Sequence, residues 1–345
     1  MSAMNLRHTY GIDMGTGSVK IYDRSSDAIT KEMNMIAIKD RDTVFAVGND
    51  AYEIFEKNPE DLQLITPMKM GRIQDVLMME AILHTLLSRI SRYAGYMPVM
   101  YFSVPLDMTE LERRAYSTIA RKGRFRRSTI YFVEKPVADA IALGIPVHST
   151  NGTMIVNIGS QSTEVSILAE GRVIISRLID KGGQEFNSAI VSGVRRRNGL
   201  TISRRTAQKL KFTLSDLNGA RSEGCRVTGV DDKTGLPREG IVSSDTVSGG
   251  VRSVLSSIAD EMLRMLERIP PQIRSAISGN GIYLSGGCVH IRGLTDYIQN
   301  ALPYPVIESE LYEFGTVTGL KQIINHAELR RYASSPAKRG GRERI

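Results

Sequence analysis

The sequence predicts an α/β protein of two lobes, each with a mixed β-sheet flanked by helices. The chain has 345 residues, which exceeds the size at which a single hydrophobic core stops growing. Strand-like segments alternate along the chain with amphipathic helical segments. A strand–turn–strand unit near residue 10 recurs near residue 155, and similar elements follow each copy. This duplication predicts two related lobes with a ligand between them.

The composition is that of an ordinary soluble globular protein, with 41% apolar and 24% charged residues. No apolar stretch has membrane-spanning length and no signal peptide is evident, so we expect a cytoplasmic location. The cysteines, Cys225 and Cys288, form neither a disulfide framework nor a metal cluster. The net charge of +8 is compatible with an anionic partner. The densest basic segment runs from Arg330 to Arg344. The last part of the chain, residues 333–345, is typical of a disordered tail.

Turn and capping signals place the elements of the first half. Thr109 and Glu112 form a capping box that opens a helix, and Pro136 and Gly144 delimit the next one. The expected strands are 9–14, 19–22, 99–104 and 129–133, and the expected helices are 75–92, 109–122 and 136–144.

In the second half we expect the same alternation. Residues 219–250 are rich in Gly, Ser and Asp and should hold short strand-like pieces, and Pro270 and Pro271 should stop a long helix. The expected strands are 154–158, 164–168, 173–178 and 281–284, and the expected helices are 186–197, 206–214, 254–269, 291–301 and 313–329.

Three glycine turns carry the candidate chemistry. Glycine lets a backbone approach a phosphate closely, and successive N–H groups in such a turn form an anion nest. Hydroxyl groups in the turns add donors, and Asp13 is placed to hold Mg²⁺ through a water molecule. The first turn contains Asp13, Gly15, Thr16, Gly17 and Ser18; the second contains Asn157, Gly159, Ser160, Gln161, Ser162 and Thr163; the third contains Gly286, Gly287 and Cys288.

With these turns in order, the chain resembles the actin superfamily and, within it, the MreB cell-shape proteins, over roughly residues 8–330. No single run decides the resemblance, but order and spacing together are specific. The matching runs are Gly11–Thr16, Val47–Ala51, Pro67–Ile73, Val104–Pro105 with Glu112–Ala115, Glu134–Ile141, Gly182–Phe186, Val194–Arg197 and Leu284–Gly287.

The resemblance implies an actin-like fold of four subdomains around a cleft that holds ATP or ADP with Mg²⁺. Lobe I would span 1–146 with an insertion subdomain at about 32–74, and lobe II 147–332 with an insertion at about 182–248. The first two turns would bind phosphates. Gly182 and Gly183 would lie near the ribose, Gln208 and Lys211 near ribose and base, and Gly286, Gly287 and Cys288 near the adenosine.

Several residues depart from the family pattern. Asn157 stands where an Asp helps to hold the metal's water shell, and Ser160 and Gln161 replace glycines. Gln208 stands where an acidic ribose contact is common. Lys135 stands where a Glu orients the attacking water, and a protonated lysine has no lone pair to do so. The adjacent Glu134 points elsewhere at the helix start. We therefore expect ATP to be bound and hydrolysed very slowly.

The resemblance also implies self-assembly into filaments that act in cell shape or intracellular organisation. A non-polymerising scaffold that modulates a partner MreB, and a plasmid- or organelle-positioning filament, are alternatives. The loop at residues 91–97 and the basic tail are candidate contacts to the inner membrane and its shape-determining proteins. For the loop, an ordinary segment that covers the core is the favoured interpretation, whereas the tail could equally be idle and solvated. Nucleic acid is not an expected partner.

Overall fold

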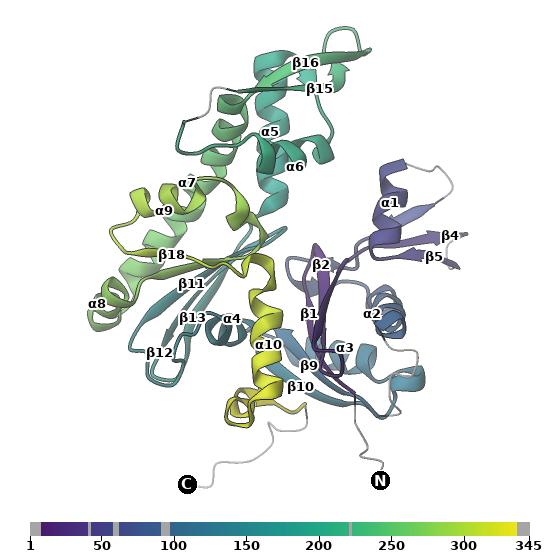
Figure 1. Cartoon of the computed structure of the whole chain (residues 1–345), viewed down its shortest axis with the longest axis vertical. Coiled ribbons are helices and arrows are strands. Elements are labelled where there is room, and N and C mark those ends of the chain that lie inside the picture. Colours follow the sequence, from purple (N-terminus) through teal and green to yellow (C-terminus); the bar gives the residue numbers. More distant parts are fainter. Residues whose placement is uncertain (1–7, 41–42, 58–61, 91–96, 221–222, 337–345) are drawn as a thin grey trace. The chain divides into compact units, whose positions relative to one another are not determined.

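The computed structural model describes residues 8–40, 43–57, 62–90, 97–220 and 223–336 (Figure 1). The chain divides into two compact units. Unit 1 joins the residues up to Pro146 with those from Phe314 onward, and unit 2 runs from Val147 to Glu313. The sequence-based division placed residues 314–332 in the second lobe. They belong to unit 1 because helix α10 (Gly315–Asn325) packs on α4 (Lys135–Ala142) and on the first strand.

The main sheet of unit 1 has the strand order β19-β10-β9-β1-β2-β3. Strands β1, β2 and β3 form an antiparallel meander, and β9 and β10 run parallel to β1 on its other side. The strands are β1 (Thr9–Met14), β2 (Ser18–Asp23), β3 (Ala28–Met33), β9 (Val99–Val104), β10 (Thr129–Glu134) and β19 (Ala333–Ser334).

Two smaller groups of strands complete unit 1 and fall within the predicted insertion at 32–74. One is a sheet in the order β5-β4-β6, and the other is the hairpin β7–β8. Their strands are β4 (Ile36–Lys39), β5 (Thr43–Val47), β6 (Gln63–Ile65), β7 (Met68–Lys69) and β8 (Arg72–Ile73). The remaining helical segments are α1 (Asn49–Lys57), α2 (Val76–Ile90), α3 (Glu110–Ala120), η1 (Gly123–Phe125) and η4 (Ala327–Tyr332). The short segment η3 (Tyr312–Phe314) begins in unit 2 and ends at the first residue of the chain's return to unit 1.

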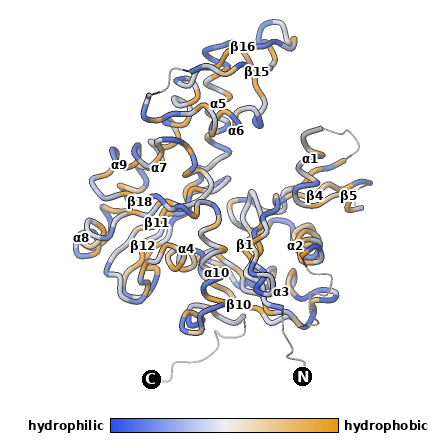
Figure 2. The backbone as a smooth tube through the Cα atoms, viewed as in Figure 1, coloured by the Kyte–Doolittle hydropathy of each residue, from blue (hydrophilic) through white to orange (hydrophobic). Residues whose placement is uncertain are grey.

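The helices of unit 1 follow the expected amphipathic and capping signals. Helix α2 buries Met79, Leu83 and Leu86, and α2 and α4 stand out as hydrophobic stretches in Figure 2. Thr109 accepts a hydrogen bond from the backbone of Glu112, whose carboxylate accepts one from the backbone of Thr109. The predicted capping box is therefore confirmed. Among the described residues, no helix combines the length and apolar character needed to cross a membrane.

Unit 2 repeats the connectivity of unit 1. Its main sheet has the order β13-β12-β11-β17-β18, in which β11, β12 and β13 are antiparallel and β17 and β18 run parallel to β11. Strands β11 and β17 thus correspond to β1 and β9, so the predicted duplication is present. The strands are β11 (Thr153–Ile158), β12 (Thr163–Ala169), β13 (Arg172–Ile179), β17 (Ile282–Ser285) and β18 (Val306–Glu308).

A second sheet of unit 2, in the order β14-β15-β16, lies within the predicted insertion at 182–248. Its strands are β14 (Leu200–Thr201), β15 (Gly224–Asp231) and β16 (Pro237–Ser243). The helical segments are α5 (Gly183–Asn198), α6 (Arg204–Thr213), α7 (Ser244–Arg268), α8 (Pro271–Asn280), η2 (Gly287–His290) and α9 (Leu294–Ala301).

The Gly- and Ser-rich region was partly mispredicted. Helix α7 begins at Ser244, because the Ser243 side chain caps it by accepting from the Thr246 N–H. Its glycines are compatible with a helix where α7 crosses α5: a Cβ on Gly250 would lie 3.0 Å from the backbone nitrogen of Ile190. Helix α8 was missed, although Pro271 occupies its first turn, where proline is favourable.

The expected disordered tail from residue 333 is corrected at its start. Ala333 and Ser334 form β19, which pairs with the edge strand β10 at Val133 and Phe132. The backbone N–H and C=O groups of β10 at this edge thereby gain hydrogen-bond partners. A tail without regular structure would not provide them. Residues 337–345 lie outside the described part of the chain.

Helices α4 and α10 touch at a point that admits no side chain. A Cβ on Gly319 would lie 1.9 Å from the carbonyl oxygen of Ala138. At Gly315, in the same helix, the only atom within 4 Å of such a Cβ is an Asp139 oxygen at 3.9 Å. The close crossing thus depends on Gly319 and not on Gly315.

We predict that Gly319→Ala lowers the free energy of unfolding by about 1–3 kcal/mol or more, because the added methyl group must push α4 and α10 apart. Urea unfolding followed by circular dichroism measures the effect. Gly315→Ala is the matched control and should cost nothing. Equal unfolding midpoints for the two variants would show that the crossing tolerates a side chain.

Candidate functional site

In unit 1 the turn between β1 and β2 is held in shape by its own backbone and by one asparagine. Gly15 donates its N–H to the carbonyl of Ser18 at 3.0 Å. The side-chain amide of Asn34 donates to the carbonyl of Gly15 at 2.8 Å, and its backbone N–H donates to that of Gly17 at 3.2 Å. Asn34 was not predicted from the sequence, because no local motif links it to the turn.

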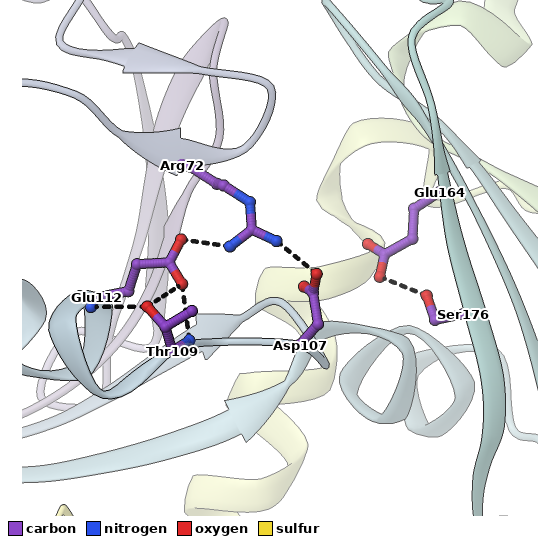
Figure 3. A network of polar contacts seen from close by, with 6 residues as sticks. All are labelled: Arg72, Asp107, Thr109, Glu112, Glu164 and Ser176. Carbon is purple, nitrogen blue, oxygen red and sulfur yellow. Dashed lines mark hydrogen bonds and ion pairs between the residues drawn. The ribbon is translucent and has the colours of Figure 1, made fainter.

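The predicted phosphate ligand Thr16 is tied to the hairpin β7–β8. Its hydroxyl oxygen accepts the N–H of Gly71 at 2.9 Å, which leaves its own proton available to donate. Arg72 fixes the hairpin by pairing with Glu112 and with Asp107, at 2.5 Å in the latter case (Figure 3).

Asp13 is buried next to the turn and both of its oxygens are bonded. Lys20, its cross-strand partner, donates at 3.0 Å, and Ser103 on β9 donates at 2.8 Å. Burial alone would raise the pKa of Asp13, but the charges of Lys20 and Lys135 and the two hydrogen bonds hold that pKa below its usual value. Neither Lys20 nor Ser103 was predicted as a site residue from the sequence. Lys20 was detectable, because a two-strand hairpin with this turn places it opposite Asp13.

The predicted catalytic position lies where β10 meets α4. Glu134 ends the strand and is the N-cap residue of the helix, without a side-chain capping bond, and Lys135 is the first helical residue. A cation at a helix N-terminus is unfavourable with the helix dipole unless an anion is close. The charge of Lys135 acts on Asp13, so unit 1 brings these two predicted residues together.

In unit 2 the turn between β11 and β12 is closed in the same way as the first. Gly159 donates its N–H to the carbonyl of Ser162 at 2.9 Å. The start of α5 binds this turn, because Gly183 donates to Gly159 at 2.9 Å and Gln184 donates to Ser160 at 2.8 Å. The side chains of Ser160, Gln161 and Ser162 are half-buried. That of Thr163 is buried and donates to the carbonyl of Lys181 at 2.7 Å, so it supports the loop.

Two of the predicted glycines are required for this convergence. A Cβ on Gly182 would lie 2.6 Å from the nitrogen of Ser162. A Cβ on Gly286, which has a positive φ of 95°, would lie 2.5 Å from the carbonyl oxygen of Ile158. Glycine is the residue that adopts this conformation and permits this approach. The loops at 159–162, 182–183 and 286–288 therefore meet at one place in unit 2.

Lys211 and Cys288 fill the space beside Gly183. The Lys211 Nζ donates to the carbonyl of Gly183 at 3.1 Å, and the Cys288 Sγ donates to that of Gly159 at 3.4 Å. Burial lowers the pKa of Lys211, while the nearby Cys288 acts in the opposite direction. Burial raises the pKa of the Cys288 thiol. These predicted residues form a buried polar contact between α6, α5 and η2.

The other predicted residues lie around this cluster. Gln208 is exposed on α6, one helical turn before Lys211, and Gly287 is half-buried. Asn157 lies on β11 between Glu164 of β12 and Ser285 of β17. Glu164 accepts a hydrogen bond from Ser176 at 3.1 Å, as Figure 3 shows.

Each unit thus carries a glycine turn at the end of the equivalent strand, with hydroxyl and lysine side chains beside it. Such turns suit a polyphosphate, because N–H groups and cations stabilise its charge. A family model described as MreB/Mbl protein matches residues 7–331. The chain belongs to the MreB/Mbl family.

Individual relatives agree with this assignment. The cell shape-determining protein MreB of Escherichia coli K12 is 31% identical over 307 residues, covering 87% of this chain and 88% of that protein. The cell shape-determining protein Mbl of Bacillus subtilis is 29% identical over 303 residues, covering 87% and 90%. The chain is therefore a homologue of cell shape-determining proteins.

Solved structures confirm the predicted actin-like fold. MreB5 of Spiroplasma citri bound to ADP has a TM-score of 0.87 and 25% identity, covering 94% of this chain and 98% of that one. A MamK double helical filament has a TM-score of 0.76 at 16% identity, covering 93% and 99%, which shows the fold alone.

The predicted metal residues suit an ion that keeps its water shell and not one that is held directly by protein ligands. Within the described ranges, no group of three or more His, Cys, Asp or Glu side chains forms a metal-binding cluster. Of the predicted metal residues, Asn157 is neutral, and both oxygens of Asp13 are engaged by Lys20 and Ser103. This donor set fits a hydrated Mg²⁺ that arrives with phosphate oxygens, because Mg²⁺ keeps several waters and is bound through one carboxylate or two.

Proposed function

We propose that this MreB/Mbl family member is an ATP-binding, filament-forming cytoskeletal protein that acts in cell shape or intracellular organisation and hydrolyses ATP slowly. The observation that carries the proposal is the pair of matching turns, each closed by a Gly N–H donating to a Ser carbonyl at the end of an equivalent strand. Membership of a family of cell shape-determining proteins supports the cellular role.

The proposed nucleotide contacts follow from the chemistry of each turn. Thr16, Ser18 and the backbone N–H of Gly17 bind phosphate from unit 1, and the backbone hydrogen bond of Gly15 closes the turn. The turn from Gly159 to Ser162 binds phosphate from unit 2, and the cluster of Gly182, Gly183, Lys211, Gly286 and Cys288 surrounds the ribose and base. That both units serve one nucleotide is an expectation from the family. MreB5 of Spiroplasma citri has been solved with ADP and with AMPPNP, which supports it.

Slow hydrolysis follows from the proposed role of the α4 N-terminus. Lys135 occupies the position at which the family resemblance implies a water-orienting Glu. Its charge acts on the buried carboxylate of Asp13, and as a protonated amine it cannot accept a proton from water. Glu134 remains the adjacent acid. We assign Lys135 to binding the terminal phosphate as a point charge.

A weak requirement for Mg²⁺ follows from the same charges. When bound, Mg²⁺ neutralises phosphate oxygens, and Asp13 would hold it through its water shell. Lys20 and Lys135 already place two positive charges close to Asp13, and Asn157 adds no negative charge. We therefore propose that the lysines supply part of the neutralisation that a divalent ion otherwise provides.

A non-polymerising scaffold is the second candidate, favoured by Lys135 and Asn157 because an inactive site fits a protein that does not cycle. Membrane attachment through residues 91–97 and the basic tail stays a prediction, since residues 91–96 and 337–345 lie outside the described part of the chain; Met97 is exposed.

We predict that the purified protein forms filaments with ATP and with ADP, and fewer without nucleotide. Negative-stain microscopy and sedimentation of the full chain in the three conditions measure this. Slow hydrolysis should make the ATP filaments persist for the duration of the experiment. Protein that stays in the supernatant in all three conditions would support the scaffold instead.

We predict that Lys135→Glu raises the rate of phosphate release by about 10²-fold or more, the range that a positioned acid–base group contributes. Lys135→Met is the control, because it removes the charge without supplying a carboxylate, and it should show no gain. The rate is measured by continuous phosphate detection under filament-forming conditions. Equal rates of phosphate release in the wild type and in both variants would show that the residue at position 135 does not limit hydrolysis.

We predict that replacing Mg²⁺ by EDTA weakens binding of ADP to the wild type by less than about tenfold. The variant Lys135→Glu replaces a positive charge near Asp13 by a second carboxylate, which repels the phosphates unless Mg²⁺ is present. Removing Mg²⁺ with EDTA should therefore weaken ADP binding much more in this variant than in the wild type. Competition against a fluorescent ATP analogue gives both affinities. A loss greater than about a hundredfold in the wild type would contradict the role given to Lys20 and Lys135.

A further inference from the structure

A small cavity lies in unit 1 between helix α2 and the strands β2 and β3 (Figure 1). Its volume is about 170 Å³. The strands contribute Val19 and Ile21 from β2, and Thr30 and Glu32 from β3. These residues share one face of the sheet, because Val19 pairs with Glu32 and Ile21 with Thr30. No step of the proposed function uses this cavity.

The inner wall of the cavity is apolar. Helix α2 contributes Leu86 and Ile90 to it, which lie one helical turn apart on the same face. Val19, Ile21 and Leu86 are 2% exposed or less and belong to the core of unit 1, whereas Ile90 is half-buried. An engineered cavity of about 150 Å³ with apolar walls stays dry and binds benzene. The cavity between α2 and the strands therefore has the size of one six-membered ring.

One side of the cavity carries two opposite charges in fixed positions. The carboxylate of Glu32 accepts the N–H of Asn49 at 2.7 Å. Arg89 donates to the carbonyl of Val47 at 3.3 Å and to the carboxylate of Asp50 at 2.7 Å. The Nη1 of Arg89 lies 4.0 Å from the Oε1 of Glu32, which is too long for a hydrogen bond. A hydroxyl group between these two atoms can donate to Glu32 and accept from Arg89.

This pair of charges indicates a neutral ligand. A ligand carboxylate would lie close to the like charge of Glu32, and a ligand ammonium close to that of Arg89, and like charges brought together are unfavourable. A neutral hydroxyl group avoids both repulsions and forms both hydrogen bonds. A ring-sized apolar wall with a place for one hydroxyl group fits a small phenol.

The cavity adjoins the phosphate turn of unit 1 along both strands. Val19 follows Ser18, the last residue of that turn, in the chain. Glu32 comes two residues before Asn34, whose side-chain amide holds the turn at Gly15. A ring in the cavity would restrain β2 and β3 where they meet the turn. Binding at one of two coupled sites changes the affinity of the other, and the effect is reciprocal.

We propose that this cavity binds a small phenol and that its occupancy strengthens nucleotide binding at the adjacent turn. The first part of the proposal stands on the cavity itself. The second part rests on the proposed function, because it needs a nucleotide at the turn.

Titration of the full chain with phenol, benzene, benzoate and benzylamine, without nucleotide, tests the first part by ligand-observed NMR. Phenol should bind about 2- to 13-fold more tightly than benzene, the net contribution of one hydrogen bond. Glu32→Gln replaces the charged acceptor by a neutral one, so it should reduce this preference and leave the benzene affinity unchanged. Tighter binding of benzoate or benzylamine than of phenol, or no binding of phenol and benzene, would overturn the proposal.

A second variant blocks the cavity. Ile90→Trp fills it from the last turn of α2 and should weaken binding of phenol and of benzene more than about tenfold. Leu77→Trp is the matched control, because Leu77 lies on the same helix, is 63% exposed and does not line the cavity. This control should leave both affinities unchanged. Equal phenol affinities in the wild type and in Ile90→Trp would place the phenol elsewhere and overturn the proposal.

The second part is tested by measuring ATP affinity with and without saturating phenol, in competition against a fluorescent ATP analogue. Phenol should raise the ATP affinity of the wild type by about fivefold or more, the lower end of coupling between sites. It should have no effect on that of Ile90→Trp. Phenol binding that leaves the ATP affinity of the wild type unchanged would overturn the coupling. A wild type that binds phenol but no nucleotide would refute the proposed function and support the first part alone.

Discussion

Backbone segments that approach too closely to admit a side chain hold the candidate site of unit 2 together. Gly182 lies against the turn at Ser162, and Gly286 lies against the end of β11 at Ile158. The start of α5 can donate its first N–H groups to the carbonyls of Gly159 and Ser160 only because of these approaches. A Cβ at either glycine would separate the loops by more than a hydrogen bond can span. The positions of Lys211 and Cys288 depend on the same approaches, because these side chains donate to the carbonyls of Gly183 and Gly159.

Electrostatics distinguish the two units. Unit 1 surrounds one buried carboxylate, Asp13, with two lysines, whereas the corresponding turn of unit 2 carries neutral side chains. Two cations and one anion leave a net positive charge, and polyphosphate is the kind of ligand that such a charge attracts. In the function proposed above, Lys135 in place of a Glu therefore favours binding of the terminal phosphate and removes the group that would help water attack it. Retained binding and slow turnover would then have one physical cause.

The fold was predictable from the sequence to a large extent because its signals are local. The capping box at Thr109, the proline at residue 136 and the alternating strands each depend on a few neighbouring residues, and the structure has them where expected. Residues 244–250 and 333–334 were mispredicted, because a helix crossing and an edge strand decide their conformation. Such contacts join residues far apart in the chain. Residues 314–332 were given to the second lobe for the same reason, since α10 packs on a helix 180 residues earlier.

Site residues that lie within a local motif were predictable from the sequence. Residues that tertiary packing brings to the site from distant segments were not. The glycine turns were found from local strand–turn patterns, but Asn34 and Ser103 reach the site from other segments. Ser103 illustrates the limit most clearly, since it lies 90 residues after Asp13 in the chain and only the pairing of β9 with β1 brings its hydroxyl within 2.8 Å of that carboxylate. The shape of a glycine turn is set by a few neighbouring residues, which a motif contains. The groups that support Asp13 are gathered by tertiary packing, and no local pattern in the sequence records such contacts.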